Sequence, residues 1–250
     1  SQYNLGRMYD KGQGVNQDYK KAVKWYRLAA EQGDSSAQYN LGHMYEGGLG
    51  VVQDYKEAVK WWRLAAEQGD SYAQYNLGFM YYNGRGVIQD YKESVKWWRL
   101  VAEQGFAQAQ FKLGNMYYKG QGVVQNKKEA IKWFKKSAEQ GDSSAQNNLG
   151  LMYEGGLGVV QDYVMAHMFY NLAAVSGDKT SIENRDLIAN KMSHSQIAKA
   201  EDMAMEWERM NGKVDYNADR EGESQVIIVV IIILLLFILA FLQKKKRHKI

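Results

Sequence analysis

Apolar residues recur along the chain at intervals of three and four, the spacing that places them on one face of an α-helix. Two consecutive segments show this pattern, with apolar faces formed by Ala37, Leu41 and Tyr45 and by Ala58, Trp61, Leu64 and Ala65. The segments are followed by Gly48 and Gly50 and by Gly69. Glycine ends helices readily because it adopts the left-handed backbone conformation without a side-chain clash. The pattern therefore predicts a pair of short helices.

This helix pair recurs five times with a period of 36 residues. A Leu-Gly pair stands at 5–6, 41–42, 77–78, 113–114 and 149–150, and a Gly-x-Gly-Val turn at 12–15, 48–51, 84–87, 120–123 and 156–159. A helix pair this short cannot bury its apolar face alone, so adjacent pairs must stack. We expect an all-α repeat array with Trp61 in the core of its pair and Trp62 in contacts between repeats.

Polar residues mark the starts of the predicted helices. Ser35 precedes Gln38 by three positions, and Asp54 precedes Glu57 by the same interval. This is the spacing of a capping box, in which each side chain accepts a hydrogen bond from the backbone N–H of the other residue. We therefore expect Ser35 and Asp54 to be N-caps.

Together these residues form the pattern A-x-x-x-L-G-x-x-Y…G-x-G-V…D-x-x-x-A-x-x-W-x-x-x-A-A-x-x-G, which resembles the Sel-1-like repeat family, a relative of the tetratricopeptide repeats. The resemblance covers residues 1–177. It implies an all-α, right-handed α/α superhelix of five 36-residue repeats, the first of them truncated. It also implies a protein that binds other proteins or peptides.

The repeat pattern stops after Gly177. Residues 182–191 predict a helix, and Ser193, with Gln196 three positions later, predicts the start of another. Both lie within residues 178–210, which resemble the C-terminal capping helices of bacterial Sel-1-like proteins. Such helices cover the apolar face that the last repeat of a solenoid otherwise exposes.

Residues 226–242 form an uninterrupted apolar run of 17 residues. As a helix the run would be about 26 Å long, close to the ~30 Å hydrocarbon core of a bilayer. Its β-branched residues also suit a buried strand, but a helical array offers such a strand no pairing partner. We expect a transmembrane helix at 226–242 that contacts the lipid bilayer, preceded by a polar stalk at 211–225.

The charges around the apolar run predict its orientation. The tail at 243–250 is basic, whereas the stalk carries four acidic and two basic residues. The positive-inside rule places the tail in the cytoplasm and the repeats on the periplasmic, other extracytoplasmic or luminal side. The alternative is a tail-anchored protein whose repeats lie in the cytosol.

The composition gives no sign of a reaction centre. The chain has no cysteine, and its four histidines show no metal-ligand spacing. The net charge is only +4, much of it in the last eight residues, so the repeats lack the basic stripe of a nucleic-acid binder. The Gly-x-Gly turns follow helices and lack the lysine of phosphate-binding loops. We expect no catalytic residue, metal, cofactor or nucleic-acid partner.

The residue after the Leu-Gly pair varies most among the repeats, and a second variable position lies beside it on the first helix. One is occupied by Arg7, His43, Phe79, Asn115 and Leu151, and the other, three residues later, by Asp10, Glu46, Tyr82, Tyr118 and Glu154. Residues three apart are neighbours on a helix face. In tetratricopeptide-like superhelices this face lines the groove, so the resemblance implies a partner-binding set of Arg7, His43, Phe79, Tyr82, Asn115, Tyr118 and Leu151. Neutral variation at solvated positions is the alternative, although aromatic residues often anchor interfaces.

The sequence thus favours a membrane-anchored scaffold that binds partner proteins or peptides in the groove of its repeats. One alternative is an envelope hydrolase or carbohydrate-processing enzyme that uses the same groove. It requires acid and base residues clustered away from the helix caps, and the sequence shows no such cluster. A purely structural envelope protein is the other alternative.

Overall fold

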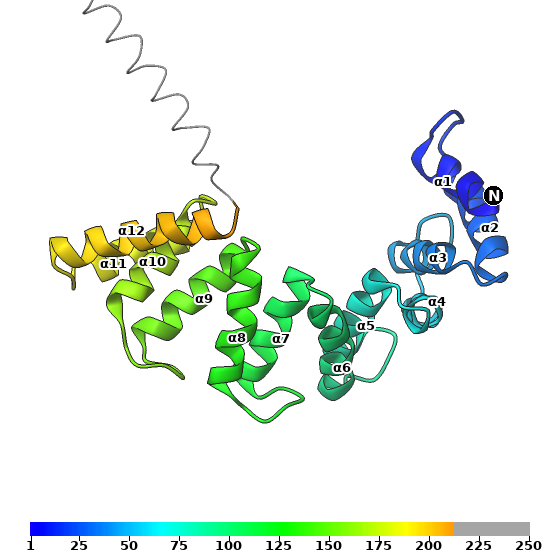
Figure 1. Ribbon diagram of the computed structural model, residues 1–250. Coiled ribbons are helices and arrows are strands. Elements are labelled where there is room, and N and C mark those ends of the chain that lie inside the picture. The colour runs from blue at the N-terminus through cyan, green and yellow to red at the C-terminus, as the bar shows by residue number, and fades with distance from the viewer. Residues whose placement is uncertain (213–250) are drawn as a thin grey trace, which may run out of the picture. The chain divides into compact units, whose positions relative to one another are not determined.

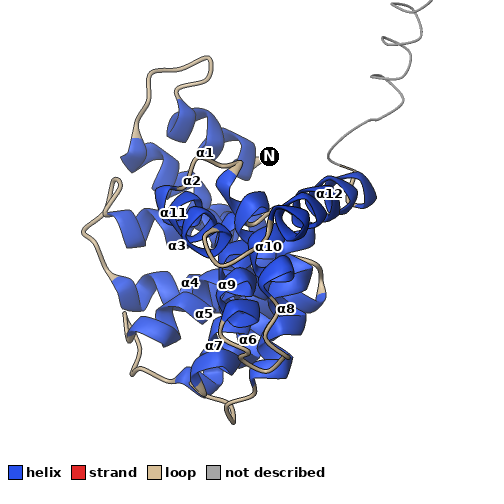
Figure 2. Ribbon diagram, turned by 90° about the vertical axis from the view of Figure 1, so that its left-hand side faces the viewer, coloured by secondary structure: helices blue, strands red, loops and turns tan. Residues whose placement is uncertain are grey.

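A computed structural model describes residues 1–212. Within them the backbone forms α-helices joined by turns, with no strand (Figure 2). The helices are α1 (Gln2–Lys11), α2 (Tyr19–Ala30), α3 (Ser35–Gly47), α4 (Tyr55–Glu67), α5 (Ser71–Asn83), α6 (Tyr91–Glu103), α7 (Ala107–Lys119), α8 (Lys127–Glu139), α9 (Ser143–Glu154), α10 (Tyr163–Ala174), α11 (Lys179–Ala189) and α12 (His194–Met210). The chain divides into two compact units, Ser1–Ala200 and Glu201–Ile250. The expected transmembrane helix and basic tail lie outside the described residues.

Each repeat contributes a first helix, with an odd number, and a second helix, with an even number. In the first unit every helix from α1 to α10 packs against the next one along the chain (Figure 1). The predicted all-α array of five stacked helix pairs is therefore confirmed. Its right-handed sense stays a prediction.

The first helices have a different N-cap from the one predicted. The cap of α3 is Asp34 rather than Ser35, and its carboxylate accepts a hydrogen bond from the Ala37 N–H at 2.9 Å. The predicted capping box is wrong because Gln38 is buried and its side-chain amide donates to the Ala30 carbonyl at 3.1 Å. A carboxylate at this position also interacts favourably with the positive end of the helix dipole.

The second helices begin where the sequence predicts. The Asp54 carboxylate accepts hydrogen bonds from the N–H groups of Lys56 and Glu57 at 2.9 and 3.1 Å. The capping box is again incomplete, because the Asp54 N–H donates to the Tyr45 carbonyl at 2.9 Å. Glu57 instead forms an ion pair with Lys60 at 3.3 Å.

The Gly-x-Gly turn needs its two glycines for different reasons. Gly48, with φ of 65°, is the C-cap that ends α3. Gly50, with φ of 72°, lies against the start of the preceding second helix. A Cβ atom at Gly50 would lie 2.7 Å from the backbone nitrogen of Lys20. The turn therefore ends one helix and also allows adjacent repeats to pack closely.

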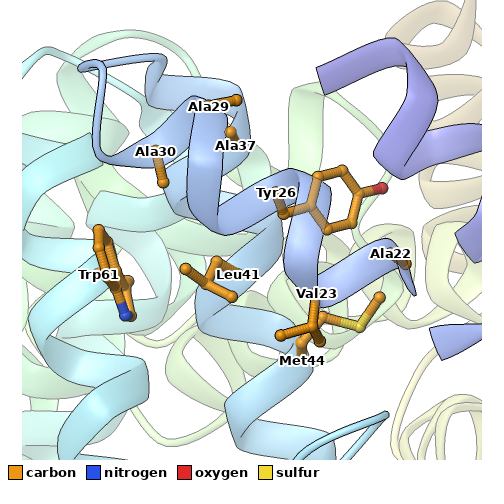
Figure 3. Packing of buried hydrophobic residues seen from close by; sticks show 9 residues of the cluster. All are labelled: Ala22, Val23, Tyr26, Ala29, Ala30, Ala37, Leu41, Met44 and Trp61. Carbon is orange, nitrogen blue, oxygen red and sulfur yellow. The ribbon is translucent and has the colours of Figure 1, made fainter. Parts of the chain in front are cut away.

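The hydrophobic core crosses the boundaries between repeats. Figure 3 shows one cluster, in which α2 packs with Leu41 and Met44 of α3 and with Trp61 of α4. Trp61 therefore belongs to the contact between repeats, whereas Trp62 is fully buried and packs on Gly42 of its own repeat. The predicted roles of these two tryptophans were thus reversed. Leu64, predicted to be buried, is 38% exposed.

The glycine of each Leu-Gly pair makes room for an aromatic ring of the second helix. A Cβ atom at Gly6 would lie 2.6 Å from Cδ1 of Tyr26, and one at Gly114 would lie 2.7 Å from Cδ1 of Phe134. These distances are too short for real carbon contacts, so the two helices of a repeat can reach this separation only with glycine at the position.

Buried glutamines connect successive repeats. The Gln68 side chain donates to the Gln38 side-chain oxygen at 2.7 Å, and Gln38 donates to a carbonyl of the preceding repeat. The same relay recurs from Gln140 through Gln110. A buried amide must find partners for its polar atoms, and here the partners lie on two neighbouring helices. The relay therefore fixes the register between repeats.

The C-terminal helices are close to their predicted positions. Ile188 of α11 is fully buried in a cluster with Ala166 and Tyr170 of α10, so α11 packs against the second helix of the last repeat. Before α12, Ser193 and Gln196 form the predicted capping box, with N–H to side-chain distances of 2.9 and 3.3 Å. No helix in residues 1–212 is long and apolar enough to cross a membrane.

Candidate partner-binding surface

The seven predicted partner-binding residues all lie on first helices. Arg7 lies on α1, His43 on α3, Phe79 and Tyr82 on α5, Asn115 and Tyr118 on α7, and Leu151 on α9. Arg7 and Leu151 are exposed, while the other five are half-buried. The half-burial arises because the second helix of each repeat packs beside these positions.

The second variable position meets the buried aromatic residue of its own repeat. Where that residue is tyrosine, the first helix supplies a carboxylate: the Tyr170 hydroxyl donates to Glu154 at 2.8 Å, and the Tyr26 hydroxyl donates to Asp10 at 3.3 Å. Burial and the contact with Glu154 raise the pKa of Tyr170 well above its usual range. A buried phenol requires such an acceptor. Part of the variation among repeats is therefore explained by packing.

In the second repeat His43 is held by its neighbours. Its Nε2 lies 2.8 Å from the Tyr39 hydroxyl and its Nδ1 lies 3.3 Å from the Glu46 carboxylate. Its ring also meets the Trp62 indole edge-on, with 5.4 Å between centroids. Burial raises the pKa of Tyr39 to about 12, with the nearby carboxylate of Asp70 adding to the shift. His43 thus has internal partners on three sides.

In the third repeat Phe79 and Tyr82 also have internal contacts. The Arg85 guanidinium lies 5.7 Å from the centre of the Phe79 ring. Tyr82 packs on Trp98, with 5.5 Å between ring centroids, and on Tyr91 at 5.4 Å. Both side chains remain partly accessible and therefore belong to the candidate surface. Neither of them lines one of the two cavities described below.

The structure brings three predicted residues together in one place. Asn115 and Tyr118 of α7 and Leu151 of α9 line a pocket of about 220 Å³, to which we refer as the apolar pocket. Its remaining walls are Lys119, Phe134, Asn148 and Met152. The predicted residues of repeats four and five therefore share a cavity, whereas Arg7, His43, Phe79 and Tyr82 lie outside it.

Sequence reasoning missed the residue at the back of the apolar pocket, Phe134. Its equivalents are Tyr26, Trp62, Trp98 and Tyr170. Phe134 is smaller than an indole and has no polar atom that needs a partner on the first helix. Comparison of this position among the repeats would have found it, because repeat four alone has phenylalanine there.

A second cavity adjoins the apolar pocket. It has a volume of about 290 Å³ and is lined by Ser143, Ser144, Asn147, Asn148, Asp178 and Thr180. We refer to it as the polar pocket; it shares Asn148 with the apolar pocket. Hydrogen bonds from the Ser181 side chain and backbone hold the pKa of Asp178 below its usual range, so this wall carries a negative charge at neutral pH.

The charged residues of the described chain mainly serve the fold. The aspartates before the helices are N-caps, and Glu57, Glu93 and Glu129 pair with lysines one turn later. Within residues 1–212 no group of three or more His, Asp or Glu side chains is placed to hold a metal ion. The arrangement therefore offers shape, apolar surface and hydrogen-bonding groups to a ligand.

Two solved structures with this fold are similar in sequence as well. One is c5321, a protective antigen present in uropathogenic Escherichia coli strains, with 40% identity, a TM-score of 0.74, and coverage of 82% of this chain and 45% of that chain. The other is a Sel1 repeat protein from Oxalobacter formigenes, with 38% identity, a TM-score of 0.70, and coverage of 73% and 75%. The present chain thus spans less than half of the E. coli antigen.

No curated protein matches the chain. The Sel1 repeat model, in contrast, matches five consecutive segments, residues 1–34, 35–70, 71–106, 107–142 and 143–178. Each segment contains one first helix and one second helix of the structure. Since the matched segments make up most of the chain and coincide with its helix pairs, the protein belongs to the Sel1 repeat family.

Proposed function

We propose that this protein is a scaffold that binds partner proteins or peptides along the first helices of its repeats. The observation that carries the proposal is the convergence of Asn115, Tyr118 and Leu151, from two repeats, on one pocket. Sel1 repeat proteins are generally protein-interaction scaffolds, which supports the same interpretation. Arg7, His43, Phe79 and Tyr82 extend the proposed surface over the earlier repeats.

Two exposed leucines allow a controlled test of this surface. Leu151 is 44% exposed on a first helix, and Leu100 is 41% exposed on a second helix. A photo-crosslinking amino acid would be placed at either position in the full-length protein in its native cells. We expect defined crosslinked partners from position 151 and few from position 100. Equal crosslinking at the two positions would refute the assignment to the first helices.

The same proposal includes a membrane anchor at residues 226–242. Its support is the sequence: an apolar run of 17 residues followed by a basic tail at 243–250. With the tail in the cytoplasm, the repeats lie on the extracytoplasmic or luminal side and meet partners there. The alternative, a tail-anchored protein with cytosolic repeats, follows from the same residues.

Protease protection distinguishes the two orientations. Protease added to intact cells with a permeable outer layer, or to sealed inverted vesicles, would be followed with an antibody against the repeats. Exported repeats are degraded in the cells and protected in the vesicles. The opposite result would establish cytosolic repeats, and release of the whole chain by alkaline carbonate would contradict the anchor itself.

The hydrolase alternative gains no support from the described residues. Asp34 and Asp54 are helix caps, and Glu57 is engaged in a surface ion pair. A catalytic pair of carboxylates would need to face a cavity, and Asp178 is the single carboxylate that lines either of the two cavities described here.

A further inference from the structure

The apolar pocket has the size of a site for one side chain. Its volume, about 220 Å³, is below the roughly 300–1,000 Å³ of pockets that hold drug-sized molecules. Phe134, Leu151, Met152 and the Tyr118 ring provide apolar walls. A single large aliphatic or aromatic side chain is therefore a better match than a complete small molecule.

The polar pocket offers hydrogen-bonding groups that have no partner in the described chain. The side chains of Ser144, Asn148 and Thr180 line it and form no hydrogen bond within residues 1–212. Asp178 adds a carboxylate that accepts from Ser181 and retains free acceptor positions. Because Asp178 is the N-cap of α11, the helix N-terminus offsets part of its charge, and this wall is complementary to a short neutral side chain that donates hydrogen bonds.

The spacing of the pocket residues along α9 is close to the repeat of an extended peptide. The α9 residues of the polar pocket and those of the apolar pocket are centred about five positions apart, which is roughly 7 Å at ~1.5 Å per residue. In an extended chain, side chains two residues apart point to the same side and are separated by about 7 Å. One peptide along α9 can therefore fill both pockets.

The charges give the peptide a third preference. Lys119 lines the apolar pocket at the C-terminal end of α7 and forms no ion pair in the described part of the chain. The polar pocket, in contrast, carries the Asp178 carboxylate. An acidic group on the peptide is thus favoured beside Lys119 and disfavoured at the polar pocket.

We propose that the two pockets along α9 bind an extended segment of a partner protein that presents a large apolar side chain, a neutral hydrogen-bonding side chain two residues away, and an acidic group on the Lys119 side. This inference rests on the proposed function and specifies its ligand. Because Asn148 lines both pockets, we expect its side-chain amide to bond the peptide backbone between the two side chains.

The test uses the full-length protein in detergent micelles as bait for a phage-displayed library of random heptapeptides. We expect enrichment of peptides with a large apolar residue and Ser, Thr, Asn or Gln two positions away. Binding of an enriched synthetic peptide should weaken at least about tenfold in Leu151→Asp, because an apolar anchor contributes most of the binding energy at such sites. The equally exposed Leu100→Asp serves as its matched control and should bind normally.

A second variant blocks the apolar pocket while keeping the fold. Phe134→Trp introduces the indole that repeats two and three carry at this position. Its N–H can donate to the Phe111 carbonyl, just as Trp62 and Trp98 donate to the carbonyls of Tyr39 and Tyr75 at 3.1 Å. We expect an unchanged melting temperature and loss of peptide binding.

The polar pocket is tested separately by Ser144→Ala combined with Thr180→Ala. This variant should still select peptides with a large apolar residue. It should no longer select Ser, Thr, Asn or Gln two positions away from that residue. Lys119→Gln should remove the preference for an acidic group.

Several outcomes would overturn the inference. These are the absence of enriched peptides, enrichment without the spacing of two, and binding that Leu151→Asp leaves unchanged. If peptides bind but depend on Phe79 and Tyr82, the scaffold function stands and this site assignment fails. If position 151 also gives no crosslinked partner in cells, the proposed function fails with it.

Discussion

The buried aromatic residue of each second helix determines what the first helix must provide. A tyrosine hydroxyl there is bonded to a carboxylate, as in Tyr170 with Glu154. A tryptophan N–H is bonded to a backbone carbonyl, as in Trp62 with Tyr39. Phe134 needs neither, and the residues opposite it, Asn115 and Tyr118, line a pocket instead. The pocket therefore lies where the packing makes the fewest demands on the first helix, and it is there that we propose a partner binds.

The glycine that faces each aromatic ring should not tolerate a methyl group. We expect Gly42→Ala to lower the free energy of unfolding by about 1–3 kcal/mol, because the new Cβ collides with the Trp62 indole in a packed core. Gly47→Ala in the same helix is the control. Gly47 is exposed, and its Cβ would meet the flexible Leu49 side chain at 3.2 Å. Urea denaturation followed by circular dichroism measures the free energy of unfolding of both variants. Equal stability of the two would contradict the close packing of Trp62 on Gly42.

The buried tyrosines make stability depend on pH in the alkaline range. Burial, assisted by the Glu154 contact, raises the folded-state pKa of Tyr170 above the unfolded value of about 10. The folded state therefore holds this proton more tightly, so the stabilisation is complete below pH ~10 and is lost as the pH rises through the folded-state pKa. We expect the free energy of unfolding to fall above pH ~10 and to fall less steeply in Tyr170→Phe. Denaturation curves at several alkaline pH values test this, and parallel slopes would refute it.

At the scale of single elements, α7 departs from the rule that the other first helices of repeats two to five follow. Its N-cap position holds Phe106, which makes no side-chain cap hydrogen bond, whereas α3, α5 and α9 are capped by aspartate. Phe106 instead packs edge-on against Tyr72 at 5.3 Å between centroids and near Tyr75 at 6.4 Å. Such ring contacts contribute about 0.5–1.5 kcal/mol, which is similar to the value of the missing cap.

This exchange of a cap for ring contacts can be measured with three variants. Phe106→Asp should be more stable than Phe106→Ala by about 1 kcal/mol. Both variants lose the ring contacts with Tyr72 and Tyr75, but only the aspartate can cap α7. Asp70→Ala removes the N-cap at the equivalent position of α5, so it should lower the free energy of unfolding of the unsubstituted protein by about the same amount. Chemical denaturation gives the three free energies. Equal stability of the two Phe106 variants would mean that the start of α7 cannot accept a side-chain cap.

The helix ends that could be predicted from the sequence are those determined by residues close by in the chain. The Gly48 C-cap, the Asp54 N-cap and the Ser193 capping box each depend on residues within one turn. Gln38 was misassigned because its partners lie on other helices. The apolar pocket could be predicted only in part, since repeat variation indicates Leu151 but not that α7, α8 and α9 place Phe134 behind it.

At the scale of the whole repeat array, neighbouring repeats are coupled by direct contacts. The Arg99 guanidinium donates to the Tyr117 hydroxyl of the next repeat at 2.6 Å, and equivalent pairs join Arg27 to Tyr45 and Arg63 to Tyr81. The glutamine relay adds a second connection across the same boundaries. Both contacts reach only to the adjacent repeat, so stability should be a sum of repeat terms and nearest-neighbour terms.

A nearest-neighbour array responds locally to damage at one end, which α11 allows to be tested. Ile188 is fully buried against α10, whereas the adjacent Leu187 is 63% exposed. Ile188→Ala should destabilise the end of the array by about 2–5 kcal/mol, because it leaves a cavity beneath the capping helix. Leu187→Ala should change the stability by less than about 0.5 kcal/mol.

Hydrogen exchange followed by mass spectrometry resolves where the stability is lost. In Ile188→Ala we expect faster exchange in α9, α10 and α11 and unchanged exchange in α1 to α4. The reason is that the contacts between repeats described above join only adjacent repeats, so the loss of stability should not reach the first repeats. Uniformly faster exchange from α1 to α11 would show that the array unfolds as one cooperative unit. In that case a partner seated on α9 would stabilise every repeat equally, whereas a nearest-neighbour array confines its effect to repeats four and five.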